Sequence, residues 1–202
     1  MGKYRINIST PALKAKFRIA YNIPLEVGLL LANEGEIPEC TPSSVPFPII
    51  AIVEGRVRFP LPSLYLEFFG VSNLTPSQLT MNSFRIIGSA IGLGEILNIN
   101  LGLPELFSCY TLAGRKNGRF YLRHKSGQVK FLFHRPDKEK HHKDYIIVSG
   151  PFEYPAGQDY GPYTIARSPG LPSRFISYVA AFLLLFLALS FKFELDHSLF
   201  LL

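Results

Sequence analysis

Prolines and glycines are spread along most of this chain, and they limit the length of any helix that it can form. The 202 residues include 16 Pro and 16 Gly, together above the usual share of about 12% in globular proteins. Proline removes a backbone donor and clashes with the preceding turn, and glycine destabilises a helix interior. Since 48% of the residues are hydrophobic and 18% are charged, the chain still has enough apolar side chains for a core. We therefore expect a folded domain of short elements and exclude a long coiled coil.

The middle of the chain carries the clearest helix signals. Apolar segments that start at a capping residue or proline and stop at a glycine or turn predict helices over residues 63–70, 82–97 and 103–110. In the second segment Gly88 and Gly92 lie four residues apart, which predicts a close backbone approach. Arg85 and Glu95 in the same segment argue against a membrane location for it.

The pattern changes to a period of two after Gly114. Strands are predicted over residues 119–124, 129–133 and 145–148, with a turn at 125–128 between the first two. Residues 1–20 are expected to be loosely structured, with a break at Thr10-Pro11, and the proline-rich stretch 33–48 is expected to be an extended loop. Residues 49–53 fit either a strand or the start of a helix.

The predicted fold class is α+β: several short helices followed by a small antiparallel sheet, plus a C-terminal hydrophobic helix. The predicted parts are a basic N-terminal segment (1–19), a domain (20–150), a Pro/Gly-rich linker (151–174), a candidate transmembrane helix (175–191) and a tail (192–202).

Charge is distributed in blocks. Residues 1–25 carry five bases and no acid, and residues 26–54 carry five acids and no base. Residues 115–143 carry ten Lys and Arg residues against Asp137 and Glu139, a net charge of +8. An excess of this size attracts phosphate groups or an acidic protein surface.

The third block coincides with the predicted strands. Phe120, Tyr121, Phe131 and Phe133 alternate with basic residues there, a composition that can stack bases and neutralise phosphates. The candidate nucleic-acid-binding residues are Arg115, Lys116, Arg119, Arg123, Lys125 and Lys130. The alternative is a solvated hairpin with long basic side chains.

The C-terminal region holds an uncharged run that begins at Phe175 and ends at Phe191, bracketed by Arg174 and Lys192. A helix of this length is about 26 Å long, slightly shorter than a bilayer core of about 30 Å. Three interpretations stay open: a tail anchor that inserts into a membrane with the body in the cytosol, a buried core helix, and an extension that is not a natural protein end.

No constellation of an enzyme is recognisable. There is no Gly-x-Ser-x-Gly elbow, P-loop or dinucleotide fingerprint. Cys40 and Cys109 are too few for a disulfide framework or a cysteine-rich metal site, and the adjacent pair His141 and His142 lacks partners at metal-ligand spacing. We therefore predict no catalytic residue, metal, cofactor or small-molecule substrate.

Several stretches resemble a known family, the putative gypsy-type transposase domain of plant retrotransposon-derived proteins. They lie within residues 20–150, at 21–24 (YNIP), 58–62 (RFPLP), 76–85 (PSQLTMNSFR), 119–123 (RFYLR) and 143–148 (KDYIIV). Members of that family commonly have Trp where Phe84 and Lys143 stand here, and they are longer, with charged coiled coils downstream. The chain is therefore similar to a fragment of the family with an atypical hydrophobic C-terminus.

The resemblance implies an element-encoded, gag-like protein rather than an enzyme. Phosphodiester transfer needs a carboxylate cluster that holds two metals, and the acids of this chain form no such set. The predicted function is that of a non-enzymatic retrotransposon-derived protein that contacts nucleic acid through its basic hairpin. The alternative is a tail-anchored membrane protein whose cytosolic domain binds protein partners. The expected location is the membrane if the tail is a natural end, and otherwise the nucleus or cytoplasm.

Overall fold

A computed structural model describes residues 4–115, 118–131, 144–155 and 164–171 of the chain. The helices are η1 (Arg5–Ile8), α1 (Pro11–Tyr21), α2 (Ile49–Val53), α3 (Ser63–Ser72), η2 (Pro76–Gln78), α4 (Met81–Leu97) and α5 (Leu103–Cys109). The strands are β1 (Gly28–Leu31), β2 (Ser44–Pro48), β3 (Tyr110–Gly114), β4 (Phe120–His124) and β5 (Tyr145–Ser149). Helices combined with small antiparallel sheets confirm the predicted α+β class.

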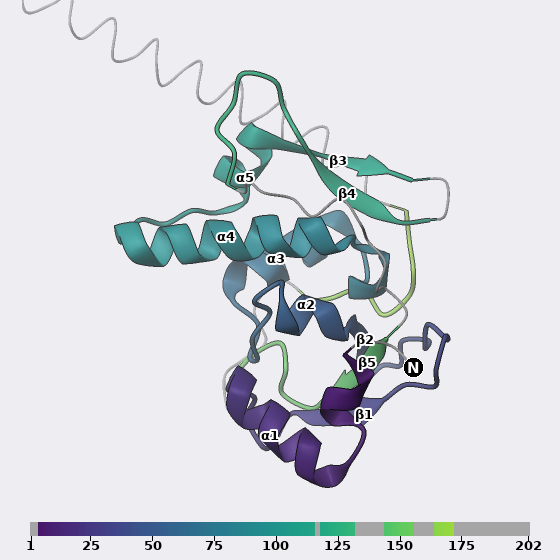
Figure 1. Ribbon diagram of the computed structural model, residues 1–202. Helices are drawn as coiled ribbons and strands as arrows, with labels where there is room; N and C mark the ends of the chain where they lie inside the picture. Colours follow the sequence, from purple (N-terminus) through teal and green to yellow (C-terminus); the bar gives the residue numbers. More distant parts are fainter. Residues whose placement is uncertain (1–3, 116–117, 132–143, 156–163, 172–202) are drawn as a thin grey trace, which may run out of the picture.

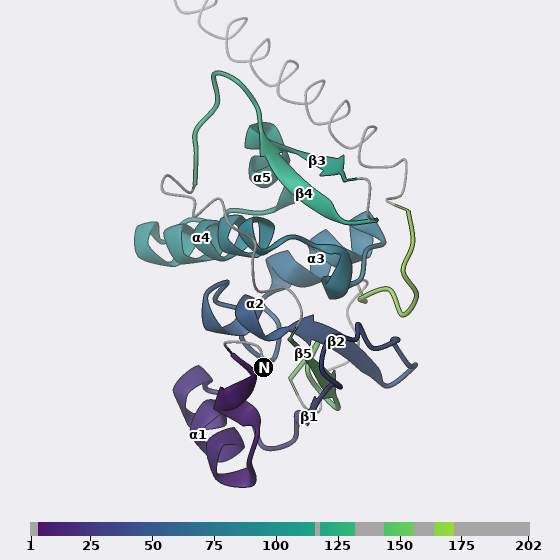
Figure 2. The ribbon, with the colours of Figure 1, turned by 45° about the vertical axis from the view of Figure 1, so that its right-hand side comes forward.

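The elements form three regions along the length of the molecule. Figures 1 and 2 both place α1 and the sheet of β1, β2 and β5 at one end, and α5 with β3 and β4 at the other. Helices α2, α3 and α4 lie between these two ends (Figure 1). The helical middle therefore lies between the two small sheets.

The larger sheet corrects the predicted order of elements. It has the strand order β1-β5-β2, with β5 antiparallel to both neighbours. The prediction that the strands follow the helices is wrong for β1 and β2, and β2 lies in the stretch expected to be an extended loop. Pro46 and Pro48 fit there because β2 is an edge strand, where proline removes no hydrogen bond that the sheet needs.

The smaller sheet corrects the predicted hairpin. We expected residues 119–124 to pair with 129–133, but β4 pairs with β3, in a register that places Tyr110 opposite His124 and Ala113 opposite Tyr121. The predicted turn at 125–128 is present, with Gln128 N donating to Lys125 O over 3.3 Å. Residues 129–131 after it form no strand, and residues 132–143 lie outside the described ranges.

The three predicted central helices are confirmed as α3, α4 and α5. The predicted stop at Gly70 is wrong, because α3 continues to Ser72. Helices α1, α3 and α4 each end at an asparagine in the left-handed region: Asn22, Asn73 and Asn98, with φ of 50°, 54° and 51°. Asparagine tolerates this conformation better than other non-glycine residues. Residues 49–53 form the helix α2 rather than a strand.

Residues 4–21 form helical structure, contrary to the expectation of a loose segment. The predicted break at Thr10-Pro11 is the start of α1: the Thr10 hydroxyl accepts a hydrogen bond from Leu13 N over 3.2 Å, and proline occupies the first helical position. Phe17 of α1 and Tyr4 and Ile8 before it are buried in the core. The N-terminal segment is therefore packed against the rest of the fold.

Basic side chains of this segment donate to backbone carbonyls around β1. Arg5 donates to Ala32 O over 2.6 Å and Lys14 to Leu29 O over 3.1 Å. Arg18 donates to both Pro24 O and Val27 O, each over 2.6 Å. Carbonyls that face away from the sheet need partners, so these three cations help to fix α1 beside the strand.

The core between α2, α3 and α4 depends on a close backbone approach. A Cβ atom built on Gly88 would lie 2.5 Å from Gly55 O, so the predicted approach at Gly88 is confirmed. The fully buried Tyr65 fills the adjoining space, and its hydroxyl lies 2.8 Å from Phe84 O and 3.1 Å from Gly55 O. Gly92 differs, since its nearest neighbour would be an arginine side-chain nitrogen at 3.5 Å.

The described parts of the predicted linker are packed against the body. Phe152 and Ile165 are buried, and Glu153 forms a salt bridge of 2.7 Å with Arg167. Further along, the Gln78 side-chain amide donates to Gly170 O over 2.8 Å. Among the described residues no helix is both long and apolar enough to span a bilayer, and the candidate transmembrane run 175–191 lies outside them.

Candidate nucleic-acid interface

The hairpin of β3 and β4 has one face in the core and one toward solvent. In β4, Phe120 and Leu122 are buried, with 8% and 1% of their surfaces exposed. The residues that alternate with these two are Arg119 and Tyr121, which are half-buried, and Arg123, which is exposed. Because successive strand residues point to opposite faces, the last three share the outer face.

The start of α4 fixes the hairpin from its other edge. Phe120 O accepts a hydrogen bond from Thr80 N over 2.9 Å. The Ser83 hydroxyl accepts one from Leu122 N over 2.9 Å, and it is buried. Strand β4, which carries the outer face, is therefore hydrogen-bonded to β3 along one edge and to the start of α4 along the other.

Arg115 joins this outer face from the end of β3. Its backbone N–H donates to Arg119 O over 2.7 Å, which closes the hairpin. Its guanidinium carbon lies 5.3 Å from the centroid of the Tyr121 ring, within the range of a cation–π interaction. Arg115 and Tyr121 thus form a cation–π pair on the outer face.

Arg119 lies at the side of the face nearest to β5. Its guanidinium donates to the Tyr145 hydroxyl over 3.4 Å. Burial raises the pKa of Tyr145, and the nearby Arg119 opposes that rise. Arg119 is therefore partly a link between the two sheets as well as a surface cation.

The other candidates separate into different positions. Lys125 Nζ donates to Phe107 O over 2.6 Å, so this cation binds the C-terminal end of α5. Lys130 is exposed beyond the turn, and Lys116 lies outside the described residues. The structure therefore brings together Arg115, Arg119 and Arg123 around Tyr121, and it places Lys125 in a structural contact.

The aromatic residues predicted to share the basic hairpin also divide. Phe120 belongs to the core. Phe131 is half-buried and packs on Tyr110 with ring centroids 5.6 Å apart, and Phe133 lies outside the described residues. Tyr121 is left as the aromatic residue of the outer face.

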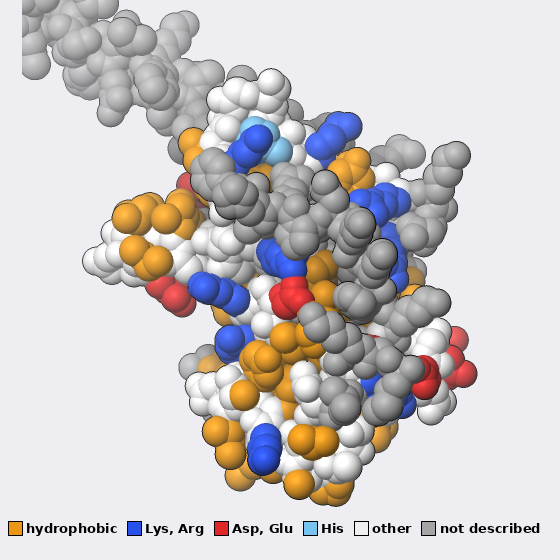
Figure 3. Space-filling model, in the orientation of Figure 1, with side chains coloured by type: hydrophobic (Ala, Val, Ile, Leu, Met, Phe, Trp, Pro, Cys, Tyr) orange, Lys and Arg blue, Asp and Glu red, His pale blue; other side chains and the backbone are white. Residues whose placement is uncertain are grey.

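No carboxylate interrupts the sequence of this region. From residue 106 to residue 136 the chain has seven Lys and Arg residues and no Asp or Glu. Figure 3 shows Lys and Arg side chains gathered on the upper right of the molecule, over the hairpin of Figure 1. A cationic surface of this kind binds phosphate groups in preference to partners without negative charge.

The pairing of β3 with β4 had a signal that the sequence analysis missed. Asn117-Gly118 is a strong hairpin-turn dipeptide, and Gly118 has the positive φ of 71° that such turns need. The turn at 125–128 also contains a glycine, Gly127. The sequence therefore predicts that residues 119–124 pair with 129–133 across that turn.

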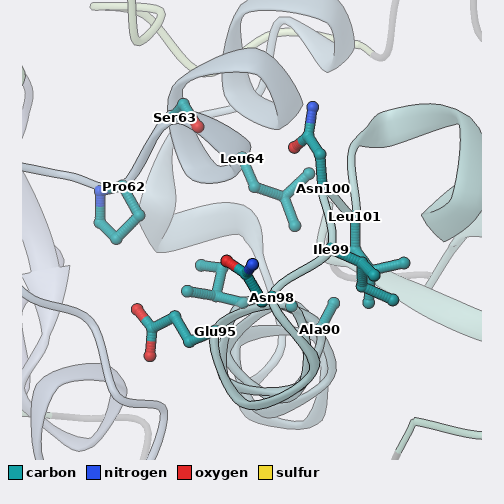
Figure 4. Close-up of a pocket in the computed structure, with 11 residues that line it drawn as sticks. Pro62, Ser63, Leu64, Ala90, Glu95, Asn98, Ile99, Asn100 and Leu101 are labelled. Atoms are coloured by element: carbon teal, nitrogen blue, oxygen red, sulfur yellow. The ribbon is translucent and has the colours of Figure 1, made fainter.

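A hollow lies between the start of α3 and the end of α4. It measures about 400 Å³, and Figure 4 shows Leu64, Ala90 and Leu101 among the residues around it. Glu95 is the one charged side chain among its described lining residues. Its lining is therefore largely apolar and amide in character.

No three His, Cys, Asp or Glu residues within the described ranges are close enough together to hold a metal ion. Comparison of the chain with protein-family models, with curated proteins and with solved structures gives no match.

Proposed function

We propose that this chain is a non-enzymatic, retrotransposon-derived, gag-like protein that contacts nucleic acid through the outer face of its β3–β4 hairpin. The observation that carries the proposal is the grouping of Arg115, Arg119 and Arg123 around Tyr121 on one surface. Cations bind phosphates by charge, and an aromatic face among them adds a contact with bases.

The family assignment within this proposal rests on the sequence resemblance to the plant gypsy-type transposase domain. Its longest similar stretch, residues 76–85, contains Thr80 and Ser83, which hold β4 in place. In this proposal that stretch supports the binding face rather than contacting the ligand.

A pair of double variants tests nucleic-acid contact. R115Q/R123Q removes two positive charges from the hairpin, and K16Q/R56Q removes two exposed charges elsewhere. We expect R115Q/R123Q to weaken binding of a labelled single-stranded oligonucleotide by about tenfold or more at low salt, and K16Q/R56Q to change it little. Fluorescence anisotropy measures both affinities. Equal weakening by both variants would show a non-localised charge effect and would overturn the hairpin assignment.

A second candidate function follows from the uncharged run 175–191. We propose as the alternative that this run anchors the protein in a membrane and that the body binds protein partners in the cytosol. A helix of its length nearly matches a bilayer core. Alkaline extraction of membranes from cells that make the full chain, beside a chain stopped after Gly170, tests this. Retention of the full chain alone supports the anchor, and extraction of both chains refutes it.

A further inference from the structure

We infer that the β3–β4 hairpin binds unpaired nucleic acid, with one base stacked at the Arg115–Tyr121 pair. This inference rests on the proposed nucleic-acid contact and specifies its ligand as single-stranded DNA or RNA. Its basis is the aromatic ring of Tyr121 among the cations, because binding of phosphates by charge alone would need no aromatic residue.

Tyr121 has a small neighbour on the adjacent strand and a guanidinium over its ring. Its cross-strand partner is Ala113, the smallest side chain that a strand can place there apart from glycine. Tyr121 is half-buried, and Arg115 lies over its ring, so a base would stack at the edge of this pair or on the outer side of the guanidinium. We call the Tyr121 ring, with Ala113 beside it and Arg115 over it, the platform.

The cations lie on several sides of that platform. Arg123 in β4 and Arg119 immediately before it are each two residues from Tyr121, about 6.7 Å away for extended chain. Arg115 lies over the ring itself, 5.3 Å from its centroid. A planar guanidinium can stack with a base as well as bind a phosphate. The arrangement therefore suits one base at the centre and phosphates at either side.

Duplex DNA does not use such an arrangement well. Its bases are stacked inside the helix, so a surface tyrosine meets phosphates and sugars instead. Unpaired bases can stack on aromatic side chains regardless of sequence. We therefore expect a preference for single strands that depends on Tyr121, together with a charge-dependent contact shared by single strands and duplexes.

The absence of tryptophan from the chain makes a direct test possible. The sequence has ten Tyr and no Trp, so Y121W introduces the only tryptophan, which can be excited selectively over tyrosine, at the hairpin. Y21W introduces one on α1 at the opposite end of the molecule. Single-stranded oligonucleotides of one mixed sequence, as DNA and as RNA, and the matching DNA duplex are the probes.

The inference predicts that the single strands quench Y121W fluorescence strongly, that the duplex does not, and that Y21W responds to none of them. The DNA and RNA arms show which strand is preferred. Binding of single strands by anisotropy without quenching of Y121W would overturn the stacking assignment.

A second set of variants separates this inference from the proposed function. Y121L removes the aromatic face and is expected to weaken single-strand binding by about tenfold, whereas Y121F keeps the wild-type affinity. If R115Q/R123Q weakens binding but Y121L does not, the basic hairpin binds nucleic acid without stacking a base. If neither variant changes binding, the proposed function itself fails. Thermal unfolding of each variant, followed by circular dichroism, confirms that the hairpin variants are folded.

Discussion

Glu54 is the side chain that connects the N-terminal segment to the central helix. It follows α2, accepts a hydrogen bond from the Tyr4 hydroxyl, and forms a salt bridge with Arg85 of α4. Arg85 is also within 3.3 Å of the Asn82 side-chain oxygen. A half-buried carboxylate with charged and neutral donors on both sides is well satisfied. This small network holds Tyr4, and with it the start of η1, against α2 and α4.

The Tyr4 hydroxyl gives this network a pH dependence. Burial, together with the hydrogen bond to Glu54 and its negative charge, raises the pKa of Tyr4 to about 12, from an ordinary value near 10. The folded state therefore holds the phenolic proton more tightly than the unfolded state. The resulting stabilisation is complete below about pH 10 and is lost as the pH rises toward about 12.

Y4F tests this at the residue scale. We expect the free energy of unfolding of the wild type to fall more between about pH 8 and about pH 11 than that of Y4F, which has no phenolic proton to lose. Urea unfolding at each pH measures both changes. Tyr65 and Tyr145 also have raised pKa values because they are buried, so both proteins lose some stability. Identical losses would show that Tyr4 does not contribute.

At the scale of elements, α4 packs through Gly88 but not through Gly92. A methyl group at position 88 would meet Gly55 O at 2.5 Å, and also the Tyr65 hydroxyl at 3.4 Å. G88A is therefore expected to destabilise the protein by about 1–3 kcal/mol through overpacking.

The matched variant G92A has a different expected effect. Its methyl group would meet the end of the Arg56 side chain at 3.5 Å, an ordinary contact. Because alanine favours helix over glycine by about 1 kcal/mol, G92A is expected to be neutral or stabilising. Chemical denaturation measures both variants, and equal effects on stability would contradict the packing described for α4.

The position of α1 depends on Arg18. Its guanidinium satisfies two carbonyls of the segment between α1 and β1, Pro24 O and Val27 O. Charge-assisted hydrogen bonds of this kind contribute about 1.5–3 kcal/mol, so R18Q is expected to lower stability by roughly 1–2 kcal/mol. K16Q, an exposed change of the same charge on the same helix, is expected to alter it by under about 0.5 kcal/mol. Thermal melts of the pair decide the matter, and indistinguishable melting temperatures would count against the role of Arg18.

Local signals predicted the central helices, and non-local pairing limited the rest. Capping residues and prolines at Thr75-Pro76 and at Pro104 act within a few residues, and the helices near them were found. The pairing of β5 with β1 and β2 joins residues about a hundred or more positions apart, and no local pattern encodes such a contact. The period-two pattern predicted a strand over residues 119–124, and β4 (Phe120–His124) confirms it. Arg115 reaches the outer face only because β3 pairs with β4. The turn at Gly127 pointed to a different partner for β4, so the sequence did not predict this position of Arg115.

Over the whole molecule, the two described basic regions differ in what their cations contact. Arg5, Lys14 and Arg18 near the N-terminus are directed at backbone carbonyls around β1. At the other end of the molecule, Arg115 and Arg123 are exposed on the hairpin (Figure 2 shows the two ends). Exposure alone does not distinguish the hairpin, because Lys16 and Arg56 are exposed as well; the hairpin differs in that its cations surround the Tyr121 ring.

The salt dependence of binding tests the central claim most directly. The association constant of the full chain for a labelled single strand is measured by anisotropy from about 50 mM to about 200 mM KCl, for the wild type, R123Q and K16Q. If Arg123 contacts a phosphate, the logarithm of the constant falls linearly with the logarithm of salt concentration. The slope for R123Q is then shallower by about 0.7, while K16Q keeps the wild-type slope. Binding that ignores salt, or one slope shared by all three proteins, would contradict the account.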